Sequence, residues 1–115
     1  MQDFEQIKLY LRNFAKERDW EQFHSPKNLV MALSVEVSEL MEHFQWLTEQ
    51  QSASLQSETL QQVGEEIADV LLYLIRLSDQ LNINLPETIK NKMAKNEQRY
   101  PPEKVKGSSK KYTEY

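Results

Sequence analysis

Two pairs of acidic residues are the side chains in this sequence best suited to chemistry. The pairs are Glu36 with Glu39, and Glu66 with Asp69. Residues three apart lie on the same face of a helix, so each pair can converge on one point. Carboxylates about 5 Å apart, at an effective dielectric constant of about 20, repel by roughly 3 kcal/mol per pair, and a bound divalent cation turns that repulsion into attraction.

The residue types favour a hard cation. All-carboxylate ligands indicate Mg²⁺ first and Mn²⁺ second. Redox iron is disfavoured because its Glu-x-x-His pattern is missing, since His43 stands four positions after Glu39. Magnesium held by a few carboxylates usually binds a substrate's phosphates and positions or deprotonates an attacking water. The alternative is a set of solvated acids, because pairs at this spacing arise often by chance among 18 acidic residues.

Asp69 is the stronger indication of a site, because it falls inside an apolar run. We expect it to be largely buried, and a buried carboxylate without a partner costs several kcal/mol or takes up a proton. Arg76, the nearest cation within the run, is two helical turns away.

Aromatic residues near predicted helix ends form a second group. Trp20, Phe23 and His24 fall between the first two predicted helices, and Trp46 falls at the end of the second. Such side chains can form a slot in which a nucleobase stacks, each contact being worth ~1–3 kcal/mol. The alternative is local core packing.

Three polar residues share one side of the last predicted helix, namely Lys92, Asn96 and Arg99. They are close enough to meet a phosphate or a base edge, although a solvated helix face is the commoner explanation for such residues. Tyr73, one turn beyond Asp69, is expected in the core unless the carboxylate site reaches it.

The elements that position these residues are predicted to be helices, which gives an all-α fold. Two glycines in 115 residues are too few for the tight turns of sheets and phosphate-binding loops. Apolar spacings of three and four, together with the prolines, predict helices over about 4–19, 26–47, 58–81 and 86–100. Residues 48–57 are rich in Gln and Ser and predict a loop.

The third predicted helix is apolar all round in its middle, over 67–75. Such a helix must be covered on every side. Four helices cannot easily enclose one of their own members, so a second copy of the chain is expected to supply the missing wall. We therefore predict a homo-oligomer.

Composition disfavours several classes of protein. The 14 basic and 18 acidic residues give a net charge of −4, which argues against binding a nucleic-acid polymer or an anionic membrane. The absence of cysteine excludes disulfide scaffolds, zinc–thiolate sites and thiol nucleophiles. Neither a signal peptide nor an apolar run of ~20 residues is present, so a cytoplasmic location is expected.

Longer stretches of sequence carry a resemblance to a known family. The stretches are ALSVEVSEL from Ala32, FQW from Phe44 and EEIADVLLYL from Glu65, supported by WEQFHSP from Trp20. Together they resemble the MazG-like nucleotide pyrophosphohydrolases, and within them the deoxycytidine triphosphate pyrophosphatase branch. The similarity extends over nearly the whole chain.

The resemblance implies a four-helix bundle protomer, assembled as a homo-oligomer with a tetramer as the expected form, that hydrolyses a nucleoside triphosphate between its α- and β-phosphates. It assigns roles to ten positions. The metal ligands are Glu36, Glu39, Glu66 and Asp69; the base contacts are Trp20, His24, Trp46 and Tyr73; the further nucleotide contacts are Lys92 and Asn96. Our own hypothesis adds Glu36 and Glu39 as the candidate catalytic pair.

We therefore expect a Mg²⁺-dependent enzyme acting on dCTP or a modified dCTP. Water held by the metal, with Glu36 or Glu39 as base, would attack the α-phosphorus. Residues 1–100 are expected to form the domain, and 101–115 a tail packed on or near the nucleotide site. The alternatives are the same chemistry on dUTP, a purine triphosphate or phosphoribosyl-ATP, and a helical adaptor whose acidic rim binds a basic partner.

Overall fold

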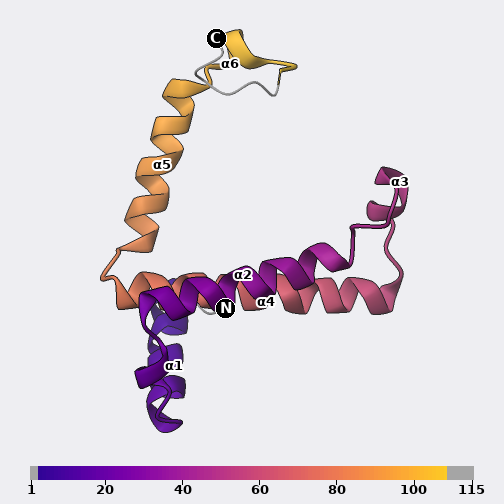
Figure 1. Cartoon of the computed structure of the whole chain (residues 1–115). Coiled ribbons are helices and arrows are strands. Elements are labelled where there is room, and N and C mark those ends of the chain that lie inside the picture. The colour runs from indigo at the N-terminus through magenta and orange to yellow at the C-terminus, as the bar shows by residue number, and fades with distance from the viewer. Residues whose placement is uncertain (1–2, 109–115) are drawn as a thin grey trace. The chain divides into compact units, whose positions relative to one another are not determined.

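The computed structural model describes residues 3–108, and all regular structure in that range is helical (Figure 1). The elements are α1 (Phe4–Glu17), the short 3₁₀ helix η1 (Glu21–Phe23), α2 (Pro26–Glu42), α3 (Glu49–Ser52), α4 (Ser57–Gln80), α5 (Leu85–Arg99) and α6 (Pro102–Val105). The prediction of an all-α fold is confirmed. None of the described helices has both the length and the apolarity needed to cross a bilayer.

Polar side chains set the starts of the first two long helices. The Asp3 carboxylate accepts a hydrogen bond from the Gln6 N–H at 2.9 Å, and the Gln6 side chain accepts one from the Asp3 N–H at 3.1 Å. Ser25 caps α2 directly before Pro26, whose fixed φ suits the first helical turn. The four long helices begin close to the predicted positions, although α2 ends at Glu42 instead of near residue 47.

The segment 48–57 differs from the prediction of a loop, because it contains the short helix α3. The Thr48 hydroxyl accepts a hydrogen bond from the Gln51 N–H at 3.1 Å, and the Gln51 side chain accepts one from the Thr48 N–H at 3.0 Å. This reciprocal capping box satisfies two N–H groups at the helix start. It forms a helical turn even though the segment has no apolar periodicity.

The paired helices α2 and α4 form the centre of a first compact unit, Met1–Ile83. They lie side by side and run in opposite directions (Figure 1), and α1 packs against α4. The buried apolar side chains come from these three helices: Ala15, Leu29, Val63 and Ile75. The pairing of α2 with α4 is what brings the two halves of the predicted acidic site together.

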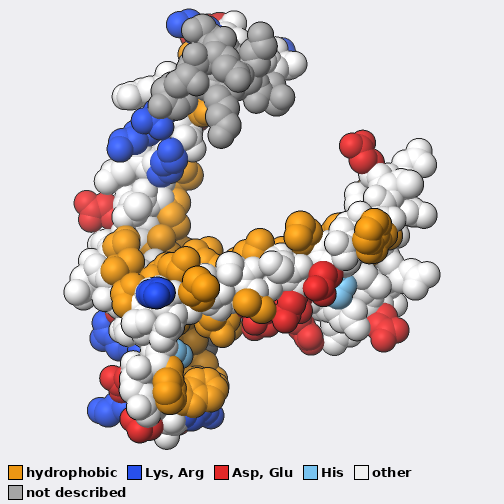
Figure 2. All heavy atoms as spheres, in the orientation of Figure 1, with side chains coloured by type: hydrophobic (Ala, Val, Ile, Leu, Met, Phe, Trp, Pro, Cys, Tyr) orange, Lys and Arg blue, Asp and Glu red, His pale blue; other side chains and the backbone are white. Residues whose placement is uncertain are grey.

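Much of the apolar surface of this unit is uncovered. Figure 2 shows hydrophobic side chains spread along the paired helices. On α4 the exposed ones include Leu60, Ile67, Leu71 and Leu74, and on α2 they include Val30, Met31, Val35, Val37 and Met41. An exposed apolar face of this extent is typical of an interaction surface. The apolar middle of α4 is therefore not enclosed within the unit.

The second unit begins at Asn84 and is described on its own. The Asn84 side chain caps α5 by accepting a hydrogen bond from the Glu87 N–H at 3.1 Å. A domain boundary at residue 100 stays a prediction. Residues 109–115 of the predicted tail lie outside the described part of the chain.

A network of ion pairs joins α1 to the last turn of α4. Asp79 accepts hydrogen bonds from Nε and Nη2 of Arg12, both at 2.7 Å, and from Nη1 of Arg76 at 3.3 Å. The side chains of Arg76 and Asp79 are only 7% and 6% exposed. The hydrogen bond from Arg12 lowers the pKa of Asp79 below its ordinary 3.8, against the opposing effect of burial.

Replacement of Asp79 by Asn is expected to remove an acid-sensitive part of the stability. Because the folded-state pKa of Asp79 is lowered, its contribution is complete above pH ~4 and is lost as the pH falls through the folded-state pKa. We expect D79N to lower the unfolding midpoint at pH 7 by about 5 °C and to flatten its decline below pH 4. Thermal unfolding followed by circular dichroism measures both effects. Asp19→Asn, at an exposed position, is the matched control, and equal pH profiles for D79N and wild type would contradict the interpretation.

Candidate active site

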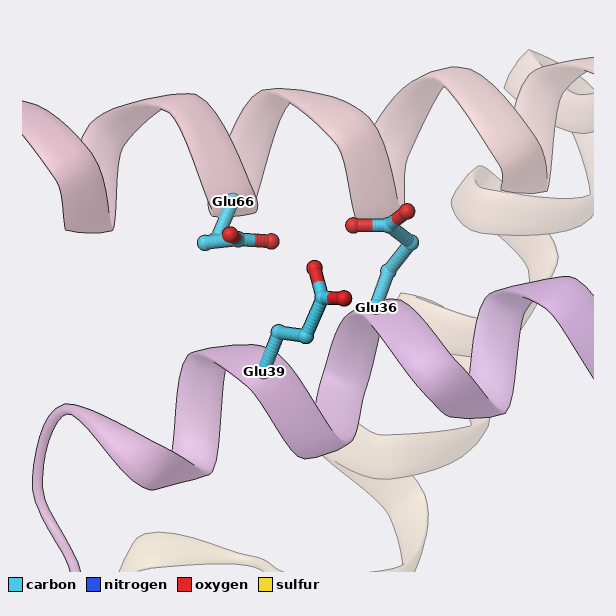
Figure 3. A group of neighbouring side chains, drawn as sticks. All are labelled: Glu36, Glu39 and Glu66. Carbon is cyan, nitrogen blue, oxygen red and sulfur yellow. The ribbon is translucent and has the colours of Figure 1, made fainter.

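Three glutamates from the paired helices converge on one point. Glu36 and Glu39 extend from α2 toward Glu66 on α4 (Figure 3). One carboxylate oxygen from each residue lies within 4.8 Å of the others. The spacing of three places Glu36 and Glu39 on one helix face, and the neighbouring helix supplies the third acid.

The electrostatics of this acidic group are unfavourable without a cation. The Oε2 atoms of Glu36 and Glu66 are buried and have no hydrogen-bond partner among the described residues. Burial raises the pKa of Glu36 to about 7, helped by the adjoining Glu66 carboxyl and by the charges of Glu39 and Asp69. Glu36 therefore keeps its proton to a higher pH than an ordinary glutamate when nothing else neutralises the group.

The same features suit a divalent metal ion. The donors are all carboxylate oxygens, which magnesium and manganese prefer. The two buried oxygens without partners are available as ligands. Glu39 is exposed, whereas Glu36 and Glu66 are half-buried, so the group is open on one side. An ion held here would remain accessible to water and to a substrate.

Asp69 lies outside this group of mutually close oxygens and is exposed. The prediction that it is largely buried is wrong for the described chain, because the neighbouring apolar positions Ile67 and Leu71 are themselves 53% and 42% exposed. The charge of Asp69 still acts on neighbouring groups. Burial raises the pKa of Tyr73, and the charges of Glu36 and Asp69 raise that pKa further. The nearby Arg76 pairs with Asp79.

An apolar pocket of about 290 Å³ adjoins the acids. It is lined by three of the predicted base-binding residues, Trp20, His24 and Tyr73, and by Asp69. Its other walls are Tyr10, Leu11, Phe14, Leu29, Leu72 and Arg76. The volume lies near the lower end of the range for small-molecule sites. Because Asp69 lines the pocket and its charge acts on Glu36, the pocket and the acidic group are neighbours.

The aromatic side chains on one wall of the pocket contact one another edge to face. The Trp20 ring lies 5.8 Å from the Phe14 ring and 6.3 Å from the His24 ring, both in edge-on geometry. The sequence predicted Trp20 and His24 to lie in a linker between helices. In the structure they flank the short helix η1, and both line the pocket. Burial and the charge of Arg76 lower the pKa of His24 below its ordinary 6.5, which favours the neutral ring.

Three predicted nucleotide contacts are not brought to the pocket within the first unit. Trp46 follows α2, is 86% exposed, and is not among the pocket's lining residues. Lys92 and Asn96 lie on α5 in the second unit. Their roles stay predictions.

Arg76 is a pocket residue that the sequence analysis did not assign to the site. Its side chain lines the pocket and donates a hydrogen bond from Nε to Nδ1 of His24 at 3.2 Å. The sequence pattern that could have identified it is an arginine at the end of an apolar helical run, followed three positions later by an aspartate. That pattern predicts a buried ion pair on one helix face.

Comparisons with known proteins identify the family of this chain. The family model of the MazG-like family matches residues 31–115. The dCTP pyrophosphatase 1 of Rattus norvegicus is 43% identical over 112 residues, and that of Homo sapiens is 43% identical over 120 residues; each match covers 96% of this chain. The chain spans 66% of the length of these curated relatives.

A solved structure shares both the fold and the sequence pattern. A pyrophosphatase from Archaeoglobus fulgidus DSM 4304 superposes with a TM-score of 0.75 at 43% identity, covering 88% of this chain and 94% of that one. The resemblance carried by the acidic and aromatic stretches is thereby confirmed. This chain belongs to the MazG-like family.

Proposed function

We propose that this chain is a divalent-metal-dependent nucleoside triphosphate pyrophosphohydrolase that converts dCTP, or a modified dCTP, to the monophosphate and pyrophosphate. The observation that carries the proposal is the acidic group of Glu36, Glu39 and Glu66 beside a pocket with an aromatic wall. The names of the dCTP pyrophosphatase relatives support the choice of base. Because free nucleotides are the substrate, the proposed location is the cytoplasm.

The acidic group is proposed to hold Mg²⁺, with Mn²⁺ as a substitute, and Asp69 to act as a fourth ligand once substrate is bound. The ion, when bound, would offset phosphate charge and lower the pKa of a coordinated water. Glu39, the exposed glutamate, is proposed to accept the proton of the attacking water. The new bond joins that water oxygen to the α-phosphorus, and the bond from the α-phosphorus to the bridging oxygen breaks, so pyrophosphate leaves.

The pocket is proposed to hold the base. Trp20 and His24 offer aromatic edges, and Tyr73 lines the pocket while its hydroxyl feels the charges of Glu36 and Asp69. Base–aromatic contacts are worth ~1–3 kcal/mol each. Trp46, Lys92 and Asn96 are proposed to complete the nucleotide site in the assembled protein.

The exposed apolar faces of α2 and α4 are proposed to pack against further copies of this chain in a homo-oligomer, with a tetramer as the expected form. Nine large apolar side chains on these two helices are exposed: Val30, Met31, Val35, Val37, Met41, Leu60, Ile67, Leu71 and Leu74. Covering them would enclose the apolar middle of α4.

A nucleotide panel tests the proposed activity. With Mg²⁺ present, we expect pyrophosphate release from dCTP to exceed release from dUTP, purine triphosphates and phosphoribosyl-ATP. Glu39→Gln is expected to lower kcat at least 100-fold, because the amide cannot accept the proton. Glu42→Gln, an exposed acid on the same helix, is the control. Turnover retained within about threefold in E39Q would contradict the mechanism, and no release from any nucleotide would favour a non-enzymatic adaptor.

Neutralising Glu36 is expected to stabilise the metal-free protein while removing its response to metal. The folded-state pKa of Glu36 is raised to about 7, so ionisation above that pH opposes folding. In EDTA at pH 8, Glu36→Gln should raise the unfolding midpoint by a few degrees, and 5 mM MgCl₂ should then add little. Wild type should have the lower unfolding midpoint in EDTA and should gain clearly more from 5 mM MgCl₂. Differential scanning fluorimetry measures both, with E42Q as control, and an undiminished Mg²⁺ response in E36Q would argue against the site.

A charge placed on the apolar face should separate the copies. Ile67→Glu puts a carboxylate at a position that is 53% exposed in the single chain and is proposed to be covered in the oligomer. Light scattering is expected to give the mass of the 13.7 kDa monomer or of a smaller oligomer than wild type. Gln61→Glu adds the same charge at an exposed polar position of α4 and should leave the mass unchanged. A wild-type protein that is monomeric at micromolar concentration would remove the proposal.

A further inference from the structure

Arg76 is a buried charge that the proposed reaction leaves without a role. Arg76 is only 6% exposed as a whole residue, among the apolar side chains of the core. A buried guanidinium must be paired and hydrogen-bonded, because leaving its charge unpartnered costs several kcal/mol. The hydrogen-bond partners of Arg76 therefore indicate its role.

One partner of Arg76 fixes its position and the other lies in the pocket. Its Nη1 donates to Asp79 at 3.3 Å, and Asp79 is held in turn by the bidentate pair with Arg12. Its Nε donates to Nδ1 of His24 at 3.2 Å. The backbone of His24 is anchored too, because the Gln80 side chain donates to its carbonyl oxygen at 2.7 Å. The last turns of α4 thus hold both the ring and the backbone of His24.

The bond from Arg76 determines where the His24 ring carries its proton. A guanidinium remains protonated and can only donate, so the Nδ1 that accepts from it must be unprotonated. A neutral imidazole then carries its proton on Nε2. Because the His24 ring lines the pocket and Nδ1 is engaged, Nε2–H is the polar group that the ring can offer to a ligand.

We propose that Arg76 is a positioning residue that locks His24 in the Nε2–H tautomer, so that the pocket presents a hydrogen-bond donor to an acceptor on the base. This inference rests on the proposed function for its ligand, a pyrimidine with carbonyl or imine acceptors. In the other tautomer Nε2 would be an acceptor. It would then face the acceptor atoms of the base with no hydrogen between them. A buried mismatch of that kind weakens binding substantially.

Nuclear magnetic resonance of the two histidine rings tests the tautomer directly. The chain has only His24 and His43, and His43→Gln assigns the signals. In ¹⁵N-labelled wild type at pH 7.5 we expect His24 to show an unprotonated Nδ1 and a protonated Nε2. In Arg76→Met we expect a mixture of tautomers. This measurement needs no nucleotide, so it stands even if the proposed function fails.

Kinetics then separate positioning from direct contact. Arg76→Met is expected to raise KM for dCTP about tenfold, with kcat changed less than about twofold, and to leave Ki for inorganic tripolyphosphate unchanged because that inhibitor has no base. In a His24→Phe background the effect of R76M on KM should disappear, since Arg76 acts through His24. Lys16→Met, at an exposed basic position of α1 that does not line the pocket, is the matched control and should leave KM within about twofold.

Three results would overturn the proposal. They are an Nδ1-protonated His24 in wild type, an unchanged His24 ring in R76M, and a KM effect of R76M that persists when His24 is Phe. Circular dichroism confirms that each variant is folded. If R76M does not fold, the wild-type ring measurement alone decides, because an Nδ1-protonated ring contradicts the proposal and an Nε2-protonated ring supports it.

Discussion

Repulsion among three carboxylates is the constraint on which the rest of this structure depends. The antiparallel pairing of α2 and α4 holds Glu36, Glu39 and Glu66 together, and two of their oxygens are buried without a donor. At roughly 3 kcal/mol for each ionised pair, this arrangement opposes folding. The raised pKa of Glu36 is the response of the metal-free chain. A site that is costly when empty is well prepared for a cation, because its ligands are already assembled.

The stability that offsets this repulsion comes from other parts of the first unit. The core side chains of α1, α2 and α4 are few, and the hydrogen-bonded ions Arg12, Asp79 and Arg76 tie α1 to the last turn of α4. The exposed apolar faces of α2 and α4 supply little stability while they remain in water. If further copies of the chain packed against these faces, apolar surface beside the acidic group would be buried and would stabilise the fold.

The sequence predicted what depends on local periodicity and missed what depends on neighbours. The spacing of Glu36 and Glu39, the apolar spacings and the prolines at 26 and 86 are local features, so the long helices and one face of the acidic group followed from them. The burial of Asp69 was predicted wrongly, because an apolar run shows that a helix must be covered but not which chain covers it. The bond from Arg76 to His24 links residues 52 positions apart, and no local pattern contains it.

One face of α4 connects the acids to the pocket and the pocket to the ion network. Glu66, Asp69, Tyr73, Arg76 and Asp79 follow at spacings of three, four, three and three, so they lie along a single helical stripe. With a rise of 1.5 Å per residue, Glu66 and Arg76 are about 15 Å apart along the axis. The proposed phosphate chemistry at the Glu66 end and the proposed base recognition at the Arg76 end would then be held by one rigid element. His24 directly precedes Ser25, the N-cap of α2, and receives hydrogen bonds from Arg76 and Gln80 of α4. A shift of α4 relative to α2 would therefore change both the acidic group and the surroundings of His24, so both ends of the site are sensitive to how these two helices pack.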